Sequence, residues 1–373
     1  MRADLTELLS KLVSIDSVNP SLVAGGAGER EIASFIADWA REAGLDAVLV
    51  GETPNRPSAI VRASGSGGGR TLLLCGHIDT VNVEGMTDPH VPRIEGDRLY
   101  GRGAYDMKGG VAAALIACRE AAKLDLAGDV VVAAVADEEH ASFGVQESLR
   151  AVSADAAIVT EPTELEIAVA HKGFVWAEIE VTGEAAHGSR PHLGVDAIVK
   201  AGPILSGIGE LDRSLGAREH ELLGRGSVHA SVISGGVEMS SYPGRCLIGL
   251  ERRTLPGETA ADVEAELEAL LERCRATDEA LVVEKRMGLV REPFEVDRSA
   301  DIVSAVAAAA GDGRAIAGVS YWADSAFIAA AGIPTVLFGP IGEGAHAQVE
   351  WVSLDSTETV ARALVDVAAK ICA

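Results

Sequence analysis

The feature that most constrains the fold is an apolar run, residues 131–136, that ends in three consecutive acids. The run is rich in Val and Ala and has polar residues on both sides, a pattern that predicts a buried β-strand. Open α/β sheets bind their ligands at the carboxyl ends of the strands, so Glu138 and Glu139 stand where such a fold places its chemistry. Two adjacent carboxylates can act as a metal ligand and as a base.

Strand and helix patterns alternate over residues 1–172 and resume over residues 288–373. This alternation predicts an α/β catalytic domain with a mostly parallel sheet and helices on both faces. Residues 173–287 instead follow the order strand–helix–strand–strand–helix–strand, which predicts an inserted ferredoxin-like α+β domain. The strands expected in the first part lie at 46–50, 71–76, 131–136 and 156–160, with helices at 4–14, 29–43, 107–123 and 144–151.

Composition excludes several classes of partner. The formal net charge of −24 argues against a nucleic-acid or anionic-membrane surface, since both need basic residues. We find no apolar stretch that could cross a bilayer and no apolar signal core at the N-terminus. The five cysteines are scattered and odd in number, which fits a disulfide framework poorly and favours the cytoplasm. The Gly-rich segment 64–69 lacks the G-K-[ST] of a phosphate loop, which argues against a nucleotide-binding enzyme.

Further ligand-type residues follow other predicted strands and turns. His77 and Asp79 end a strand, and side chains two apart on an extended segment point the same way, so Asp79 can orient His77. Asp106 follows a Gly-rich turn at the start of a helix, where it can bridge two cations or simply cap the helix. Glu161 follows a third strand, and His346 lies in a Gly-rich loop near the C-terminus. Each has an ordinary structural explanation alone, but together they indicate a two-metal hydrolase.

At these motifs the chain resembles the dinuclear-zinc deacylases and carboxypeptidases. That family includes acetylornithine deacetylase, succinyl-diaminopimelate desuccinylase, aminoacylase and glutamate carboxypeptidase. The resemblance covers essentially the whole chain and rests on GHIDTV (76–81), LYGRGAYDMKGG (99–110), DEE (137–139), TEP (160–162) and AH (345–346). The glycine-flanked Asp motif together with the double Glu is its most specific part.

The resemblance implies a site with two zinc ions, whose ligands also suit cobalt or manganese. The implied ligands are His77 and Glu161 for one ion, His346 and Glu139 for the other, and Asp106 as the bridge. Glu138 would be the general base and acid, with Asp79 beside it as a second catalytic residue. The resemblance also implies a cis peptide bond between Asp106 and Met107.

The inserted module resembles the family's lid and dimerisation domain. There the segment EAAHGSRP (184–191) implies that His187 reaches the site of a neighbouring subunit and helps to hold the developing oxyanion. Arg253 occupies the position of an arginine that grips a substrate carboxylate, for which a guanidinium fork is well suited. Ser240 stands where many relatives carry a substrate-contacting Asn, and His229, on a predicted lid strand, is a further substrate-binding candidate.

The expected function is therefore hydrolysis of the amide bond of an N-acylated amino acid, by a dizinc-bridged water that Glu138 activates. A dizinc carboxypeptidase or dipeptidase is the nearest alternative, because the shape of the lid pocket separates the two. An inactive ligand-binding homologue is the alternative from another class, but it should have lost a metal or base residue. The expected partners are a small N-acyl amino acid or peptide and a second copy of the chain, paired through residues 173–287.

Overall fold

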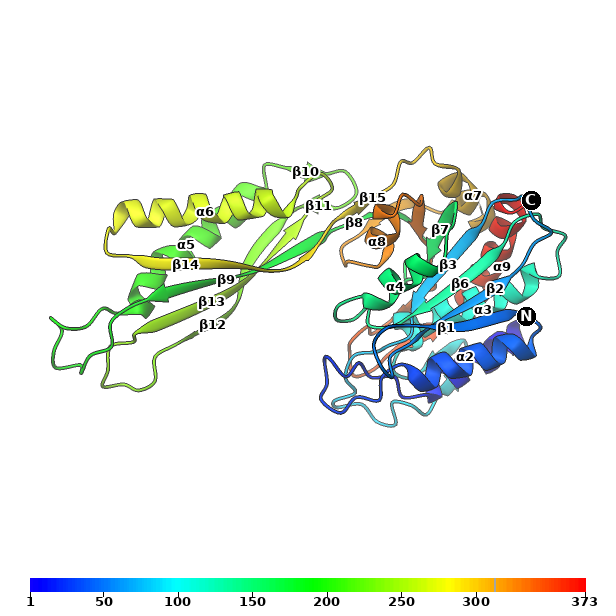
Figure 1. Ribbon diagram of the computed structural model, residues 1–373, viewed down its shortest axis with the longest axis horizontal. Coiled ribbons are helices and arrows are strands. Elements are labelled where there is room, and N and C mark those ends of the chain that lie inside the picture. The colour runs from blue at the N-terminus through cyan, green and yellow to red at the C-terminus, as the bar shows by residue number, and fades with distance from the viewer. Residues whose placement is uncertain (312) are drawn as a thin grey trace. The chain divides into compact units, whose positions relative to one another are not determined.

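The computed structural model describes residues 1–311 and 313–373, and its contacts divide the chain into two compact units (Figure 1). Unit 1 comprises Met1–Val169, Val296–Gly318 and Ala323–Ala373, and unit 2 comprises Ala170–Glu295 and Val319–Trp322. Within the described residues, no helix is both long enough and apolar enough to cross a membrane.

The large sheet begins in unit 1 and has the strand order β1-β2-β6-β3-β7-β17-β8-β15, with β16 paired to β8. Its strands are β1 (Asp46–Val50), β2 (Ser58–Ala63), β3 (Leu72–His77), β6 (Val130–Val135), β7 (Ala156–Val159), β8 (Ile167–His171), β15 (Phe294–Glu295), β16 (Ile316–Val319) and β17 (Thr335–Leu337). β6, β3, β7 and β17 run parallel at the centre, and the pairs outside them with a known direction are antiparallel. β8 runs on into unit 2, where it pairs with β15.

Every residue of β3, β6 and β7 is buried, so both faces of the sheet are covered, as the apolar runs predict. The helices of unit 1 are α1 (Arg2–Ser14), α2 (Arg30–Glu42), α3 (Gly109–Ala121), α4 (Phe143–Ala151), α7 (Asp301–Ala310), α8 (Ser325–Ala330) and α9 (Leu354–Ile371). The Ala-rich α3 is buried along most of its length because it contacts α1, α9 and the sheet. The predicted α/β architecture is therefore confirmed.

A second, smaller sheet of unit 1 joins distant parts of the chain in the order β18-β19-β5-β4. Its strands are β4 (Arg93–Glu95), β5 (Arg98–Tyr100), β18 (Gly342–Glu343) and β19 (Trp351–Ser353). Strands of two or three residues carry no readable period, so the sequence pattern did not predict them. This sheet matters because it brings the turn before α3 next to the loop between β18 and β19.

Unit 2 has a four-stranded antiparallel sheet in the order β12-β13-β9-β14, with α5 and α6 over one face (Figure 1). Its elements are β9 (Gly173–Thr182), α5 (Ala197–Leu215), β10 (Glu219–His220), β11 (Gly224–Arg225), β12 (Ser227–Gly235), β13 (Arg245–Thr254), α6 (Ala260–Thr277) and β14 (Val282–Arg291). Alternate residues of β9 are buried, and they form a core with both helices. The connectivity is the ferredoxin-like order that the pattern predicts.

Candidate metal centre

Three parallel strands of unit 1 end at one edge of the large sheet, and each brings a ligand-type residue there. His77 is the last residue of β3, Glu138 and Glu139 follow β6, and Glu161 follows β7. The arrangement brings Nε2 of His77 to 3.9 Å from Oε1 of Glu161. The carboxyl edge of the sheet therefore carries the cluster that the strand pattern predicts.

Asp106 lies between two histidines that are far apart in the sequence. Its Oδ1 is 3.1 Å from Nε2 of His77, and its Oδ2 is 3.4 Å from Nε2 of His346. Nε2 of His346 is also 3.1 Å from Oε2 of Glu139. One carboxylate thus presents each of its oxygens to a different imidazole, which is the arrangement that a ligand bridging two cations requires.

The turn that carries Asp106 is built by glycines and by one buried acid. Gly103 has a φ of 75°, a left-handed conformation that L side chains rarely adopt. A Cβ on Gly110 would lie 2.0 Å from the carbonyl oxygen of Thr160, so α3 can approach β7 only with glycine there. The peptide bond between Asp106 and Met107 is cis, as predicted.

Glu350 holds this turn through four hydrogen bonds. Its Oε1 accepts hydrogen bonds from the backbone amides of Tyr105 (2.9 Å) and Asp106 (3.1 Å), and its Oε2 accepts from Gly103 N (2.9 Å) and Arg102 Nη1 (2.7 Å). The sequence analysis missed this residue. Its only signal was a charged position just before the short apolar segment that became β19.

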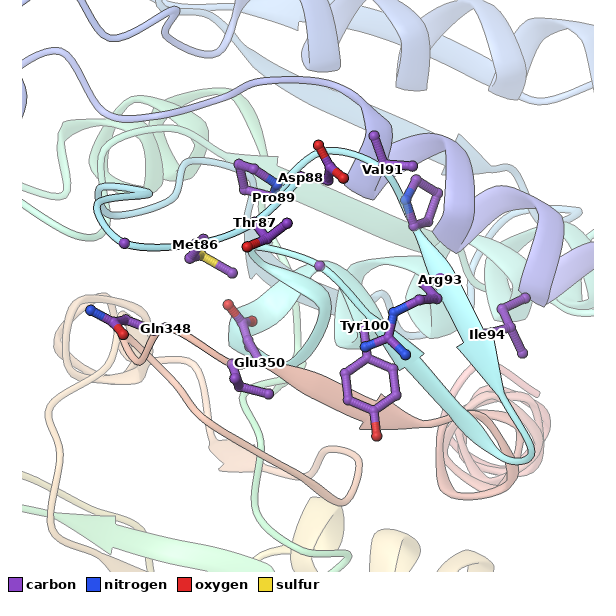
Figure 2. Close-up of a pocket in the computed structure, with 14 residues that line it drawn as sticks. Met86, Thr87, Asp88, Pro89, Val91, Arg93, Ile94, Tyr100, Gln348 and Glu350 are labelled. Atoms are coloured by element: carbon purple, nitrogen blue, oxygen red, sulfur yellow. The ribbon is translucent and has the colours of Figure 1, made fainter.

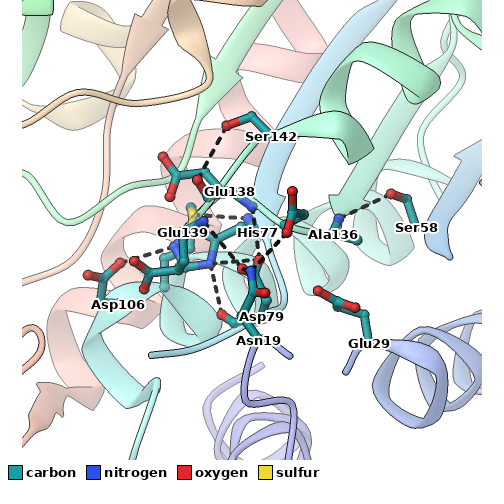
Figure 3. Close-up of polar contacts among 12 residues, drawn as sticks. Asn19, Glu29, Ser58, His77, Asp79, Asp106, Ala136, Glu138, Glu139 and Ser142 are labelled. Atoms are coloured by element: carbon teal, nitrogen blue, oxygen red, sulfur yellow. Dashed lines mark hydrogen bonds and ion pairs between the residues drawn. The ribbon is translucent and has the colours of Figure 1, made fainter. Parts of the chain in front are cut away.

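Asp79 orients His77 differently from the expectation. Nδ1 of His77 is 3.0 Å from the backbone oxygen of Asp79 and 3.7 Å from its nearer carboxylate oxygen. The carboxylate instead accepts hydrogen bonds from the backbone amides of Glu138 (3.1 Å) and Glu139 (3.3 Å) (Figure 3). The main chain of Asp79 therefore orients the imidazole, while its side chain holds the double-Glu turn.

Burial and mutual repulsion dominate the electrostatics of the cluster. Burial raises the pKa of Glu138 and of Glu161 well above the usual value, and neighbouring carboxylates raise both pKa values further. Hydrogen bonds to Asp106 and Glu139 raise the pKa of His346 to about 10. A carboxylate in such a cluster binds either a proton or a metal cation, because each of them reduces the repulsion between neighbouring negative charges.

The donor set fits divalent metal ions. Ligand atoms lie within 4.8 Å of one another in two groups, which are His77, Glu138 and Glu161, and His77, Asp106 and Glu139. Imidazole nitrogen and carboxylate oxygen are both preferred ligands of Zn²⁺. His346 adds a second imidazole beside Asp106 and Glu139.

Comparison with known proteins agrees with this geometry. Residues 73–370 match the family described as Peptidase family M20/M25/M40. The chain belongs to the M20/M25/M40 peptidase family. Acetylornithine deacetylase of Myxococcus xanthus is 32% identical over 350 residues, which cover 91% of this chain and 89% of the relative. The prediction of a metal-dependent amidohydrolase or peptidase is confirmed by the family.

Solved structures with low sequence identity share the whole fold. Aminopeptidase PepT of Bacillus cereus ATCC 10987 has a TM-score of 0.82 at 19% identity, covering 100% of this chain and 99% of its own. The YXEP protein of Bacillus subtilis, described as a dinuclear metal-binding peptidase from the M20 family, has a TM-score of 0.77 at 17% identity, covering 100% and 98%. At these identities the likeness establishes the M20 fold alone.

The remaining predicted residues of this M20 chain lie in unit 2. His187 is exposed with its Nδ1 2.8 Å from Oγ of Ser189, and the backbone of Ser240 is adjacent, since Gly188 N donates to Ser240 O at 2.6 Å. His229 is exposed on the edge strand β12.

Arg253 lies on the open face of the same sheet. Its Nε donates to Oε1 of Glu251 at 2.8 Å, and its guanidinium lies over the ring of Phe174. Arg252 points to the other side, where it is buried and paired with Glu258 and Glu266, as the strand alternation predicts.

A hollow of about 810 Å³ lies beside the Asp106 turn in unit 1 (Figure 2). The loop between β3 and β4 and residues 348–350 line the hollow. Glu350 both lines the hollow and accepts a hydrogen bond from the Asp106 turn. None of the five predicted metal ligands lines it, so we do not assign the chemistry to this hollow.

Two more buried residues near the cluster escaped the sequence analysis. Asp324, at the start of α8, is 2% exposed and close enough to add to the raised pKa values of Glu138 and Glu161. Asn19 is fully buried against Asp79. Neither is part of a metal-ligand spacing, so only the fold reveals them.

Proposed function

We propose that this M20 enzyme is a deacylase that hydrolyses the amide bond of an N-acylated amino acid at a centre of two divalent cations. The observation that carries the proposal is the position of Asp106, whose two oxygens face His77 and His346 separately. The 32% sequence identity to an acetylornithine deacetylase, over most of both chains, supports an acyl-amino-acid substrate.

Each residue of the cluster has a proposed role. The proposed ligands are His77 and Glu161 for one ion, Glu139 and His346 for the other, and Asp106 for both. We propose zinc because the donors are imidazoles and carboxylates, although cobalt or manganese accepts the same set. When bound, such cations polarise a carbonyl group and lower the pKa of a water molecule.

Proton transfer is the task that we assign to Glu138. Its carboxylate takes a proton from the attacking water as the new C–O bond forms, and returns that proton to the amine nitrogen as the C–N bond breaks. The products are a carboxylate and a free amine. Asp79 keeps Glu138 in place through the hydrogen bond from the Glu138 backbone amide.

Unit 2 supplies the groups that we propose to bind substrate and stabilise charge. His187, an exposed imidazole, would donate a hydrogen bond to the oxygen on which negative charge develops. Arg253 would bind the substrate carboxylate, with Glu251 holding one side of its guanidinium fork. Ser240 and His229 are proposed as further substrate contacts.

We also propose that residues 1–172 and 288–373 form the catalytic domain and that residues 173–287 form a lid through which two copies pair. Two features of unit 2 support pairing. β12 is an edge strand with the side chains of Val232 and Ile233 exposed, and α5 exposes Ile198 and Val199. An exposed apolar edge of this kind favours association with another chain.

Five buried free thiols agree with a cytoplasmic location.

The function is tested by hydrolysis of a panel of N-acetyl, N-succinyl and N-formyl amino acids beside a panel of dipeptides. Each assay is run with added Zn²⁺, Co²⁺ or Mn²⁺ and with a chelator. The proposal predicts metal-dependent release of amine from the acyl panel at higher kcat/KM than from dipeptides. Preference for dipeptides would instead favour the peptidase alternative, which the fold of PepT also fits.

A catalytically inactive binding protein is separated by the same measurement. Such a protein would bind metal and an acyl amino acid but turn over neither panel. An inactive protein should have lost a metal or base residue. This chain instead brings the whole set together in one cluster, which favours catalysis: His77, Asp106, Glu138, Glu139 and His346.

A further inference from the structure

The double-Glu turn is held by a buried network that lies behind the metal ligands. The turn begins at Asp137, whose φ of 67° is a left-handed conformation that ordinary residues avoid. Its backbone oxygen accepts hydrogen bonds from the amides of Ala141 (3.1 Å) and Ser142 (2.6 Å). The direction in which Glu138 and Glu139 leave the sheet depends on this turn.

Asn19 links the turn to Asp79. Its Nδ2 donates to Oδ2 of Asp79 at 2.8 Å (Figure 3). The same Nδ2 donates to Oδ1 of Asp137 at 3.0 Å, and Oδ1 of Asn19 accepts from the amide of Ser21 at 2.9 Å. Asn19 is fully buried, and its backbone amide donates to the carbonyl of Thr80 at 2.8 Å. A neutral amide suits this place because one NH₂ group can donate to two carboxylates, which an aspartate cannot do.

Arg56 supplies the positive charge behind Asn19. Its Nη2 is 2.8 Å from Oδ1 of Asp137, and its Nε and Nη2 form a two-pronged pair with Glu29 at 2.8 and 2.5 Å. Nη1 donates to Oγ of Ser21, the residue that also contacts Asn19. Glu29 is fully buried and Arg56 nearly so, which makes these contacts strong and geometrically specific.

The chain of contacts runs without a gap to the predicted ligands. Arg56 binds Asp137, and Asn19 joins Asp137 to Asp79. The carboxylate of Asp79 then accepts hydrogen bonds from the backbone amides of Glu138 and Glu139. We propose that Asn19, backed by the Arg56–Glu29 pair, is a positioning residue that sets the directions of the Glu138 and Glu139 carboxylates. The inference rests on the proposed metal centre and adds to it residues that contact neither metal nor substrate.

The proposal predicts a specific loss on removing either donor. In Asn19→Ala, Asp79 and Asp137 lose their shared donor, and in Arg56→Met, Asp137 loses its cation. Groups that support metal ligands in this way typically contribute about 10- to 100-fold in affinity or activity. We therefore expect kcat to fall by about 10- to 100-fold in each variant, with Co²⁺ bound more weakly and KM little changed.

The test uses full-length metal-free protein and Co²⁺ alone as the probe. Affinity is measured by competition with a chromophoric chelator, and the visible absorption of the Co²⁺-loaded protein reports ligand geometry. Kinetics follow on the best substrate of the panel. Arg56→Lys keeps the charge and should recover part of the affinity and of the wild-type spectrum.

The matched control is Arg252→Met in unit 2. Arg252 is buried and paired with two glutamates, as Arg56 is paired with Glu29 and Asp137, and every proposed metal ligand lies in unit 1. This variant should lower the Tm comparably while Co²⁺ affinity and the Co²⁺ spectrum match the wild type. Should Asn19→Ala fail to fold, Asn19→Ser and Arg56→Met provide the same comparison.

Two outcomes overturn the inference. In the first, Asn19→Ala and Arg56→Met lower only the Tm and leave Co²⁺ affinity, spectrum and kcat unchanged. In the second, the wild-type protein binds no Co²⁺, which removes the metal centre as well. Wild-type protein that binds Co²⁺ but hydrolyses no substrate would refute the proposed deacylase and leave the metal-binding comparison decisive.

Discussion

The backbone oxygen of Asp79 is 3.0 Å from Nδ1 of His77, closer than the carboxylate of Asp79, which is 3.7 Å away. The residue therefore makes two separable contributions. Its main chain fixes the imidazole that faces Asp106, and its side chain fixes the amides of Glu138 and Glu139. A side-chain substitution removes only the second contribution.

Replacing Asp79 with Asn should reduce turnover more than metal affinity. The imidazole of His77 keeps its main-chain partner, but the new amide group cannot accept both backbone hydrogen bonds and the one from Asn19. We expect kcat to fall by about 10- to 100-fold, with the affinity for Zn²⁺ falling less. Titration of the metal-free variant and steady-state kinetics measure the two quantities. A loss of affinity larger than the loss of kcat would contradict this division.

Replacing Glu138 with Ala should leave metal binding nearly intact while turnover collapses. The proton shuttle is lost, and general acid–base groups typically contribute about 10²- to 10⁴-fold in rate. Metal content by atomic absorption and kcat on the best substrate provide the measurement. Glu343→Gln, an exposed acid near His346, is the control and should behave as wild type. Near-normal turnover in Glu138→Ala would remove this residue from the mechanism.

Chelation should abolish hydrolysis and lower the Tm, and added Zn²⁺ should restore both. Burial raises the pKa values of Glu138, Glu139 and Glu161, so bound cations relieve repulsion within the cluster. Free metal at one hundred times its Kd stabilises the folded state by about 2.7 kcal/mol. Differential scanning fluorimetry with and without chelator checks the expectation, which fails if the Tm is independent of metal.

If His187 acts on the site of a partner subunit, two inactive variants should complement each other. A dimer of Glu138→Ala with His187→Ala contains one site in which both groups are intact. After random exchange, about a quarter of wild-type activity should return, because half of the dimers are hybrids with one working site. Activity is measured after mixing, with exchange followed by subunit labelling. Exchange without recovery would assign His187 to its own subunit or to no catalytic role.

Asp97 should stabilise α9 in a pH-dependent way. Burial opposes ionisation, but hydrogen bonds from Ser353, Arg2 and the amide of Asp355 outweigh it and hold the pKa of Asp97 below its usual value. Because the folded-state pKa is depressed, this stabilisation is present above about pH 4 and is lost as the pH falls through the folded-state pKa.

Asp97→Asn should therefore lower the free energy of unfolding by about 1 kcal/mol at neutral pH, as expected for a lost helix cap. The difference from wild type should shrink below about pH 4, since wild-type Asp97 becomes protonated there. Urea unfolding at several pH values measures it. Asp38→Asn, which removes an exposed pair with Arg41, is the control and should change stability little. A difference that does not vary with pH would contradict the assignment.

The ligand-type residues and the strands that carry them were predictable from the amino-acid pattern alone. Apolar runs ending at His77 and just before Glu138 and Glu161 predicted buried parallel strands. Parallel strands run in the same direction, so their carboxyl ends lie at the same edge of the sheet. The strand–helix order of residues 173–287 likewise predicted a ferredoxin-like sheet, because few topologies satisfy that order.

The groups that support the site could be identified only in the folded chain. Asn19, Arg56 and Glu350 reach the cluster from distant parts of the chain, and no local period relates them to the residues they hold. His77 contacts the backbone of Asp79 and not its side chain. This contact depends on the local path of the chain, which the two-residue spacing does not predict. Local patterns encode which face of a strand or helix is buried, whereas long-range polar contacts are selected only once the chain has packed.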